Sequence, residues 1–343
     1  MAIMAAVEAG GTKFNCGLGD ENGNIIDQVS IPTTTPEETM KKVIEYFKDK
    51  KFDVMGVGSF GPIDPIKGSK TYGHITKTPK AYWSDYNLIG ELKKHFDVPM
   101  EFDTDVNGAA LAEAWWGAGK GFKNVMYITV GTGIGAGATV DGKMLQGLTH
   151  PEMGHISVKR HPEDTFEGTC SFHGDCLEGM AAGPAIEKRW GKKGIELAED
   201  NRVWEMEAYY LSQALVNYIL ILSPEKIIMG GGVMKQKQLF PLIHKNVKEM
   251  LNGYVDKKEI LEDIENYIIY PGLGDYTANV SALTAGHAVG GKDVSRPLDG
   301  EVVEKNLSGM LSELQVMSKS LSSLKALQEV DFSKTQEQIK GMG

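Results

Sequence analysis

The sequence predicts an α/β protein built on central, largely parallel sheets, with one unit present in two copies. Apolar segments typical of strands, such as residues 54–57 and 226–229, alternate with helical periodicity, as at residues 205–222. Glycine makes up 41 of 343 residues, against an average near 7%, so its excess is expected in turns and close-approach loops. A strand–glycine–strand–hairpin order occurs twice, about 120 residues apart, which favours an internal duplication.

The first copy opens the chain. A strand ending at Ala9 precedes Gly10-Gly11-Thr12-Lys13, and a second strand over residues 14–19 leads to a tight turn at 20–24. The second copy has residues 125–130, then Gly131-Thr132-Gly133-Ile134-Gly135, residues 136–140 and a turn at 141–143. Two unrelated hairpins could show these features by chance. The matching order of strand, glycine loop, strand and turn in the two copies is what favours duplication.

Two helices are expected between the copies. Thr35-Pro36-Glu37-Glu38 supplies a cap, a first-turn proline and acidic residues, so a helix should begin there and present Met40, Val43 and Phe47 on one face. A second helix, at about 106–116, should follow the apolar strand that ends near Asp105.

Charge and composition exclude several classes of protein. With 36 basic and 46 acidic residues the net charge is −10, which does not favour binding to nucleic acid or to an anionic membrane. No apolar run reaches the ~18–20 residues of a membrane span, and residues 1–7 are expected to form a strand rather than a signal peptide. Three cysteines make no disulfide framework, so a reducing, cytoplasmic compartment is expected.

Three glycine loops that follow strands predict phosphate binding, because glycine lets backbone N–H groups approach phosphate oxygens. They are residues 10–13, 131–135 and Gly230-Gly231-Gly232. Each alone could be an ordinary turn, and the chain has no P-loop motif. Together, with two of them in matching repeats, they indicate a nucleotide bound between two lobes.

Cys170-x-x-His173-x-x-Cys176, with His155 fifteen residues before it, has the ligand types and spacing of a structural zinc site. Cys16 lies inside the first hairpin and is expected in the core. Asp103 and Asp105 stand where a strand gives way to a helix. Either could cap that helix, or one could be the carboxylate that accepts a hydroxyl proton.

These motifs together resemble the ROK family of sugar kinases, and within it the zinc-containing bacterial fructokinases. The resemblance spans about residues 4–289 and does not cover the tail. It is carried by residues 8–13, Gly58-x-x-Gly61-Pro62, Asp105-x-Asn107, residues 131–135, Glu152-x-Gly154-His155 and the Cys/His segment.

The resemblance implies the duplicated, two-lobed RNase H-like fold of actin and hexokinase. A helical tail, which the resemblance does not cover, is expected to follow it. The lobes would be residues 1–117 and 118–276, with about 277–290 returning to the first lobe. Mg²⁺-ATP and a hexose would bind between the lobes, zinc would be structural, and the chain would form a homodimer.

The resemblance also implies roles for individual residues. Asp105 would be the general base in the phosphorylation of fructose to fructose 6-phosphate, and Glu8, where relatives often have Asp, would lie near Mg²⁺. Sugar ligands would be Thr104, Asn107, Gly61, Pro62, Glu152, His155 and Glu178, with Thr104 standing where many relatives have Asn. ATP would be held by Gly10, Gly11, Thr12, Lys13, Gly131, Thr132, Gly133, Gly135, Gly231 and Gly232. Zinc ligands would be His155, Cys170, His173 and Cys176. Trp83, in a loop like the one that covers the sugar in relatives, would either pack against the sugar ring or belong to the core.

Other interpretations remain open. The substrate could be mannose, glucose or N-acetylmannosamine. The family's sugar-responsive repressors need a DNA-binding segment before the first loop, and only nine residues precede Gly10, so an enzyme is expected. In the tail, 291–343, an apolar stripe at Val303, Met310, Met317 and Leu324 predicts a helix that packs on the body or on an unidentified partner. The tail could equally be a surface helix without function. A further possibility is that it makes this an interaction or fusion protein with a kinase body.

Overall fold

The computed structural model describes residues 3–78 and 80–274. The chain divides into two units, Met1–Ser295 and Arg296–Gly343, and every described residue belongs to the first. The expected return of residues 277–290 and the tail at 291–343 therefore lie outside the described residues.

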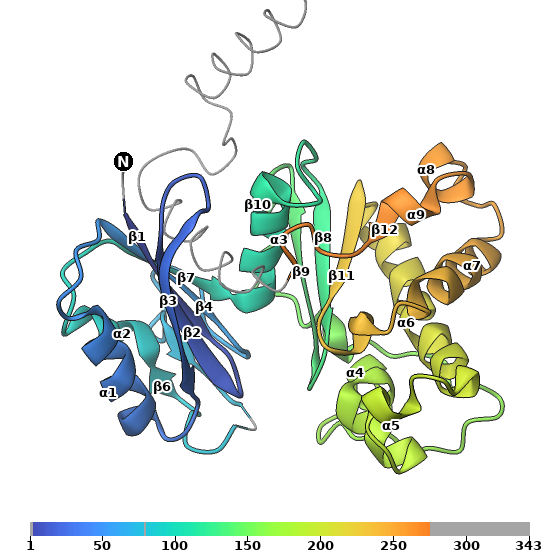
Figure 1. Ribbon diagram of the computed structural model, residues 1–343, viewed down its shortest axis with the longest axis horizontal. Helices are drawn as coiled ribbons and strands as arrows, with labels where there is room; N and C mark the ends of the chain where they lie inside the picture. Colours follow the sequence, from blue (N-terminus) through green and yellow to red (C-terminus); the bar gives the residue numbers. More distant parts are fainter. Residues whose placement is uncertain (1–2, 79, 275–343) are drawn as a thin grey trace, which may run out of the picture. The chain divides into compact units, whose positions relative to one another are not determined.

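Two five-stranded sheets have the same strand order, which confirms the predicted repetition (Figure 1). In each, an antiparallel three-stranded meander is followed by two strands parallel to its first strand. The first sheet has the order β3 (Ile25–Pro32), β2 (Lys13–Gly19), β1 (Met4–Ala9), β4 (Val54–Ser59), β7 (Met100–Thr104). The second has the order β10 (Lys143–Met144), β9 (Ile134–Val140), β8 (Val125–Val130), β11 (Lys226–Gly230), β12 (Ile268–Ile269).

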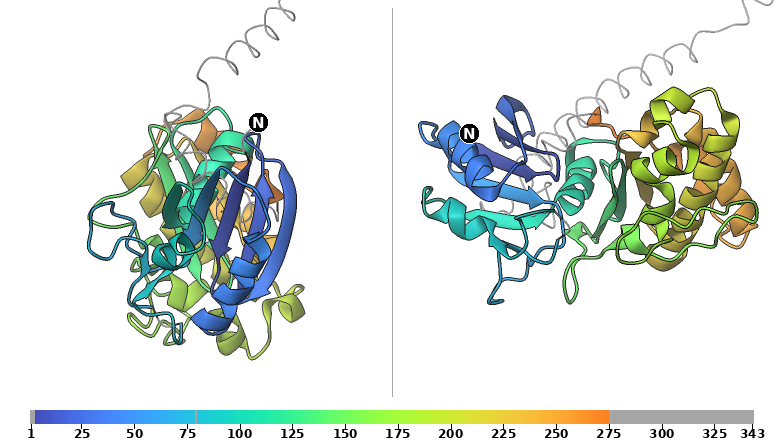
Figure 2. Two further views of the ribbon diagram at one scale, coloured as in Figure 1. Left: turned by 90° about the vertical axis from the view of Figure 1, so that its left-hand side faces the viewer. Right: turned by 90° about the horizontal axis from the view of Figure 1, so that it is seen from below.

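Helices α1 (Pro36–Phe47) and α2 (Leu88–Lys93) cover one face of the first sheet (Figure 2). The Thr35 side chain accepts a hydrogen bond from the Glu38 N–H, so the predicted cap is confirmed. A short hairpin, β5 (His74–Ile75) and β6 (Tyr86–Asn87), lies beside this layer, and Trp83 is fully buried in its core. Trp83 therefore belongs to the core, the second of the two roles expected for it.

Helix α6 (Asn201–Leu222) and helix α7 (Leu239–Leu251) cover one face of the second sheet. Helix α6 begins before the predicted residue 205, because the Asp200 side chain accepts a hydrogen bond from the Arg202 N–H and caps the helix. Shorter helices complete this layer: α4 (Leu177–Ala181), α5 (Gly183–Trp190), α8 (Lys258–Leu261), α9 (Ile264–Tyr267), η1 (Met153–His155), η2 (Gly194–Leu197) and η3 (Val233–Lys235).

Helix α3 (Asp105–Trp116) follows the first sheet along the chain but packs against the second. Its small residues, such as Ala110 and Ala114, contact Val125 and Tyr127 on the face of β8 that α6 does not cover. A Cβ on Gly137 of β9 would lie 2.3 Å from the Val106 carbonyl oxygen, so only glycine admits the helix this closely. The predicted helix is confirmed, whereas the lobe boundary at 117/118 stays a prediction.

The buried Glu113 of α3 fixes the chain where it returns from the second sheet. Its carboxylate accepts hydrogen bonds from the backbone N–H groups of Ala118 (2.7 Å), Gly272 (3.0 Å) and Leu273 (3.1 Å). Since a buried carboxylate is costly unless it is hydrogen-bonded, these contacts tie residues 272–273 to the end of α3.

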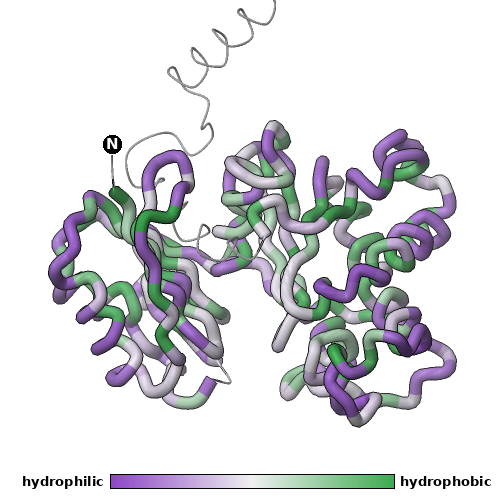
Figure 3. The backbone as a smooth tube through the Cα atoms, in the orientation of Figure 1, coloured by the Kyte–Doolittle hydropathy of each residue, from purple (hydrophilic) through white to green (hydrophobic). Residues whose placement is uncertain are grey.

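Hydropathy follows this layering. Figure 3 shows hydrophobic segments along the strands of both sheets, whereas the β2–β3 turn is hydrophilic. Among the described residues, no helix has both the length and the apolar character needed to cross a bilayer.

Gly137→Ala should lower the free energy of unfolding by about 2 kcal/mol or more, because the methyl group would meet the backbone of α3, which cannot rotate away. Thermal and denaturant unfolding would measure this. The matched control is Gly147→Ala, whose nearest described neighbour would be 4.0 Å away, with an expected change within about 0.5 kcal/mol. Equal stability of the two variants would contradict the packing argument.

Candidate active site

A row of paired positions crosses the first sheet on the face away from α1 and α2. Strand register aligns Ser30, Asn15, Glu8, Gly58 and Asp103 across β3, β2, β1, β4 and β7. Paired residues point to the same face, and Gly58 leaves the space between the two carboxylates free of a side chain. The Ser30 hydroxyl donates to Asn15 Oδ1 (2.7 Å), and Asn15 Nδ2 donates to Glu8 Oε2 (2.5 Å).

Asp103 and Asp105 have different surroundings, and neither caps α3. Thr104 is the cap, since its hydroxyl accepts from the Asn107 N–H at 3.1 Å. Asp103 is 2% exposed and accepts from the Thr104 N–H, Asn107 Nδ2 and Gln146 Nε2. Asp105 is the first residue of α3 and half-buried, and its Oδ1 accepts from the Val106 N–H (2.9 Å). Of the two carboxylates, Asp105 is therefore the one left for a ligand.

Burial, with a smaller contribution from the charge of Glu152, raises the pKa of Asp105 to about 6, although the hydrogen bonds from the Val106 and Asp105 N–H groups oppose the rise. Burial also raises the pKa of Glu8 to about 7; the Asn15 hydrogen bond and Lys13 oppose this rise, and Asp105 adds to it. These electrostatic effects show that Glu8, Asp105 and Glu152, from three different segments, lie near one another. A site with this much negative charge favours a bound cation or a shared proton.

The predicted sugar ligands Gly61 and Glu152 are brought together. A Cβ on Gly61 would lie 2.9 Å from Glu152 Oε1 and 3.3 Å from His150 Cε1. The Pro62 carbonyl accepts from the Thr76 N–H at 2.8 Å. Sequence analysis missed His150, for which the only available signal was its place two residues before Glu152.

The side chains of Thr104 and Asn107 are buried and form hydrogen bonds within the protein. Thr104 is 5% exposed and caps α3, as described above. Asn107 is 1% exposed; its Nδ2 donates to Asp103 and to the Leu145 carbonyl, and its Oδ1 accepts from the Ala138 N–H. Asn107 thus joins α3 to β9 and to the following loop. Direct contact of either side chain with a sugar stays a prediction.

The glycine loops form tight turns at the strand ends. The Gly10 N–H donates to the Lys13 carbonyl (3.1 Å), and in the second copy the Gly131 N–H donates to the Gly133 carbonyl (2.9 Å). Gly231 has φ +93°, and a Cβ there would lie 2.4 Å from the Val130 carbonyl oxygen. A Cβ on Gly131 would be 3.9 Å from the Gly232 nitrogen, so the second and third loops are adjacent. Gly11, Thr12 and Thr132 at the loop tips are exposed, as a phosphate site requires.

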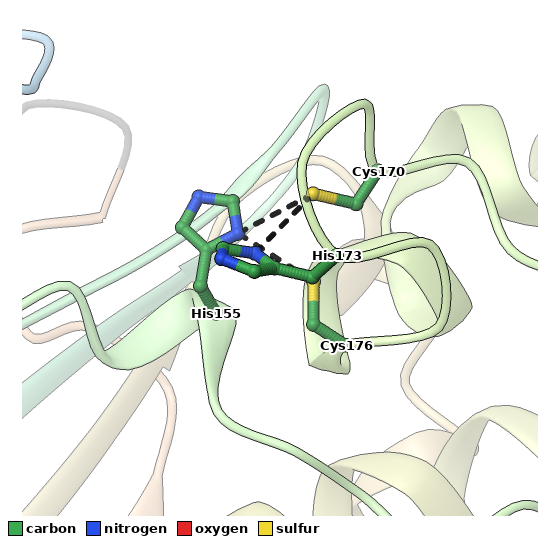
Figure 4. A group of neighbouring side chains, drawn as sticks. All are labelled: His155, Cys170, His173 and Cys176. Atoms are coloured by element: carbon green, nitrogen blue, oxygen red, sulfur yellow. Dashed lines mark hydrogen bonds between the residues drawn. The ribbon is translucent and has the colours of Figure 1, made fainter.

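The four predicted metal ligands converge (Figure 4). Their ligand atoms all lie within 4.8 Å of one another. His155 Nδ1 is 3.7 Å from Cys170 Sγ and 3.5 Å from Cys176 Sγ, and His173 Nδ1 is 3.7 Å from Cys170 Sγ. Zn–S bonds of about 2.3 Å and Zn–N bonds of about 2.0 Å in a tetrahedron imply N···S separations of about 3.6 Å, so these residues fit zinc.

Glu178 connects this cluster to the second glycine loop. Its Oε2 accepts from the Ile134 N–H (2.9 Å), and its Oε1 is 3.9 Å from Nε2 of His155, the ring nitrogen that faces away from the cysteines. A Cβ on Gly133 would lie 2.7 Å from the same Oε2. Glu178, His155 and Gly133, all predicted site residues, are therefore in one place.

Asp105→Asn should stabilise the protein increasingly as pH rises. Because the folded-state pKa of Asp105 lies above its unfolded value, the folded state binds more protons between pH 3.8 and about 6, and the carboxyl destabilises the fold once it ionises. The gain in melting temperature over wild type should be small at about pH 4.5 and largest at about pH 8. Asp141→Asn, an exposed turn substitution, should show no such trend. A gain that stays constant or shrinks with pH would contradict the assignment.

Comparison with known proteins agrees with this geometry. The ROK family model matches residues 4–274. A fructokinase of Lactococcus lactis subsp. cremoris is 48% identical over 267 residues, which cover 78% of this chain and 90% of the relative. A fructokinase of Pediococcus pentosaceus is 44% identical over 286 residues, covering 83% and 98%.

Among solved structures, the ROK hexokinase from Thermus thermophilus matches with a TM-score of 0.70 at 24% identity. The match covers 84% of this chain and 100% of that chain, and at this identity it shows the fold alone. The predicted α/β class is thereby confirmed. With its repeated sheets, its glycine loops and a family model that matches most of its length, the chain belongs to the ROK family.

Proposed function

We propose that the protein is a fructokinase, which transfers the γ-phosphoryl group of ATP to the 6-hydroxyl group of fructose. The observation that carries the proposal is Asp105, a carboxylate at the start of α3 that caps nothing and whose pKa burial raises to about 6. Such a group is ionised near neutral pH yet basic enough to accept a hydroxyl proton. The two fructokinases compared above support fructose as the substrate.

In the proposed mechanism, the hexose lies against Gly61 and Glu152, which meet at one point of the site. The Glu152 carboxylate accepts hydrogen bonds from sugar hydroxyls, and its side chain is 46% exposed and so accessible to a ligand. Asp105 accepts the proton of the attacking hydroxyl as the new O–P bond forms and the bond between the γ-phosphorus and the bridging oxygen of ADP breaks, so that ADP leaves. Backbone N–H groups of the loops at Gly11 and Thr132 donate to the phosphate oxygens.

Glu8 supports this chemistry from the first strand. Its carboxylate, held by Asn15, lies close enough to Asp105 for the charge of Asp105 to add to the rise in pKa that burial causes at Glu8, and Lys13 is near it. Oxygen ligands of this kind suit Mg²⁺, which with ATP would neutralise charge on the phosphoryl group. Glu8 would hold the metal at the phosphate loop, while Asp105 handles the proton.

Mannose, glucose and N-acetylmannosamine remain the alternative substrates. The Thr104 hydroxyl is occupied as the cap of α3, so the proposal assigns sugar selection to Glu152, His155 and Glu178.

Homodimer formation and a reducing, cytoplasmic compartment are kept as parts of the proposal. A reducing compartment suits Cys170 and Cys176, which are free thiols. The proposed role of the tail in interactions lies outside the described residues.

Asp105→Asn should reduce kcat at least about 100-fold, as expected when a general base is removed, without loss of folding. A coupled assay of ATP turnover with fructose, mannose, glucose and N-acetylmannosamine would measure this and would rank the four sugars for the wild type. Asp141→Asn serves as the isosteric control and should retain wild-type turnover. Retention of more than about a tenth of the activity by Asp105→Asn would refute its role as base.

We also propose that the His155, Cys170, His173 and Cys176 cluster holds a structural zinc ion, which suits the converging N and S donors. Through His155 and Glu178 the cluster would brace the loop that contacts both the sugar and Ile134.

Metal analysis should find about one zinc per chain in wild type and in Cys16→Ala, since Cys16 is buried away from the cluster, and much less in Cys176→Ser. Cys176→Ser should also melt at a lower temperature, because the loop at 155–176 would lose its cross-link. Less than half an equivalent of zinc in carefully prepared wild-type protein would contradict the zinc proposal.

A further inference from the structure

His150 occupies a buried position where the loop after β10 meets the turn at residues 61–63. Its side chain is only 2% exposed. Nε2 of the ring accepts a hydrogen bond from the Ile63 N–H at 3.0 Å, and Thr149 Oγ1 approaches the Ile63 carbonyl at 3.5 Å. The imidazole therefore joins two segments that are 87 residues apart in the sequence.

The partner at Nε2 determines which ring nitrogen carries the proton. A backbone N–H only donates, so Nε2 must present its lone pair, and the proton of the neutral ring is on Nδ1. That nitrogen is 3.4 Å from the Pro151 carbonyl oxygen and 3.6 Å from Glu152 Oε1. Both of these atoms are hydrogen-bond acceptors. The Nδ1–H donor therefore faces acceptors, and the Nε2 acceptor faces a donor.

Gly61 shows how closely these groups are packed. A Cβ on Gly61 would lie 2.9 Å from Glu152 Oε1 and 3.3 Å from His150 Cε1. The absence of a side chain there lets the turn, the imidazole and the carboxylate meet. Burial raises the pKa of the nearby Asp103 carboxylate, and His150 lies close enough to oppose that rise. One oxygen of Glu152 thus lies beside the imidazole and the turn, while the rest of its side chain stays accessible.

We propose that His150 is a positioning residue for the sugar. It holds the Glu152 carboxylate and the Gly61-Pro62 turn in the relative position that a bound hexose requires. The inference rests on the proposed function, in which Glu152 accepts sugar hydroxyls. His150 does not touch the substrate. It orients the carboxylate through Nδ1–H and holds the facing turn through Nε2, so that a hexose meets both at once.

Two variants separate the two ends of the ring. His150→Gln places an amide oxygen near the Nε2 position and keeps the acceptor for the Ile63 N–H, but it loses the donor toward Glu152. His150→Asn does the reverse. We expect His150→Gln to raise KM for fructose about tenfold, with KM for ATP changed less than about twofold and an unchanged melting temperature.

A double-mutant cycle with Glu152→Gln tests whether the effect passes through the carboxylate. In the Glu152→Gln background, His150→Gln should change KM for fructose by less than about twofold, because the group that it orients is already altered. Equal increases in both KM values, or an undiminished effect in that background, would overturn the inference and leave His150 with a merely structural role.

The tautomer provides a readout that needs no activity. Long-range ¹H–¹⁵N NMR of the wild-type chain should show the His150 proton on Nδ1, and His150→Asn should lower the melting temperature by removing the acceptor for Ile63. A proton on Nε2 would overturn this inference alone. A wild-type chain that phosphorylates none of the four hexoses would instead overturn the proposed function.

Discussion

The close packing of α3 on β9 is the contact on which the candidate site depends. Helix α3 begins directly after the last strand of the first sheet, yet its small residues pack on the second sheet. Gly137 permits this, since a Cβ there would overlap the helix backbone. Asp105 therefore follows the first sheet in sequence and packs on the second. This explains how one carboxylate lies near both Glu8, whose pKa it helps to raise, and Glu152, whose charge raises the pKa of Asp105.

Two aspartates separated by a single residue show how different surroundings give identical groups different roles. Asp103 is surrounded by amide donors from Thr104, Asn107 and Gln146, so its oxygens are used in holding the helix start and the neighbouring loop. Asp105 accepts hydrogen bonds from the backbone N–H groups of Val106 and of Asp105 itself. The hydrogen bonds of Asp103 hold the start of the helix in place, whereas Asp105 keeps a basic carboxylate oxygen that can accept a proton.

Much of the fold could be predicted because the signals are local. The cap at Thr35, the two hairpins and the helix at 105–116 each depend on residues a few positions apart. The four zinc-type ligands could also be predicted, since three of them lie within one short segment.

Features that depend on distant pairings could not be predicted. The contact of Asn15 with Glu8 requires the β1–β2 register, and that of Gln146 with Asp103 joins residues 43 apart. His150 acquires its partner from residue 63, and no local pattern marks it. The use of the Asn107 amide as an internal connector, rather than as an open ligand, likewise follows only from the approach of β9.

Glu113 sets a lower limit on the length of chain that can form this fold. Its carboxylate depends on N–H groups from residues 272 and 273, more than 150 positions away, as well as on Ala118. A chain ending before Gly272 would lack the Gly272 and Leu273 donors to that buried carboxylate, inside the helix that carries Asp105. The segment that follows the second sheet is thus coupled to the helix that begins the site, although more than 150 residues separate the two in the sequence.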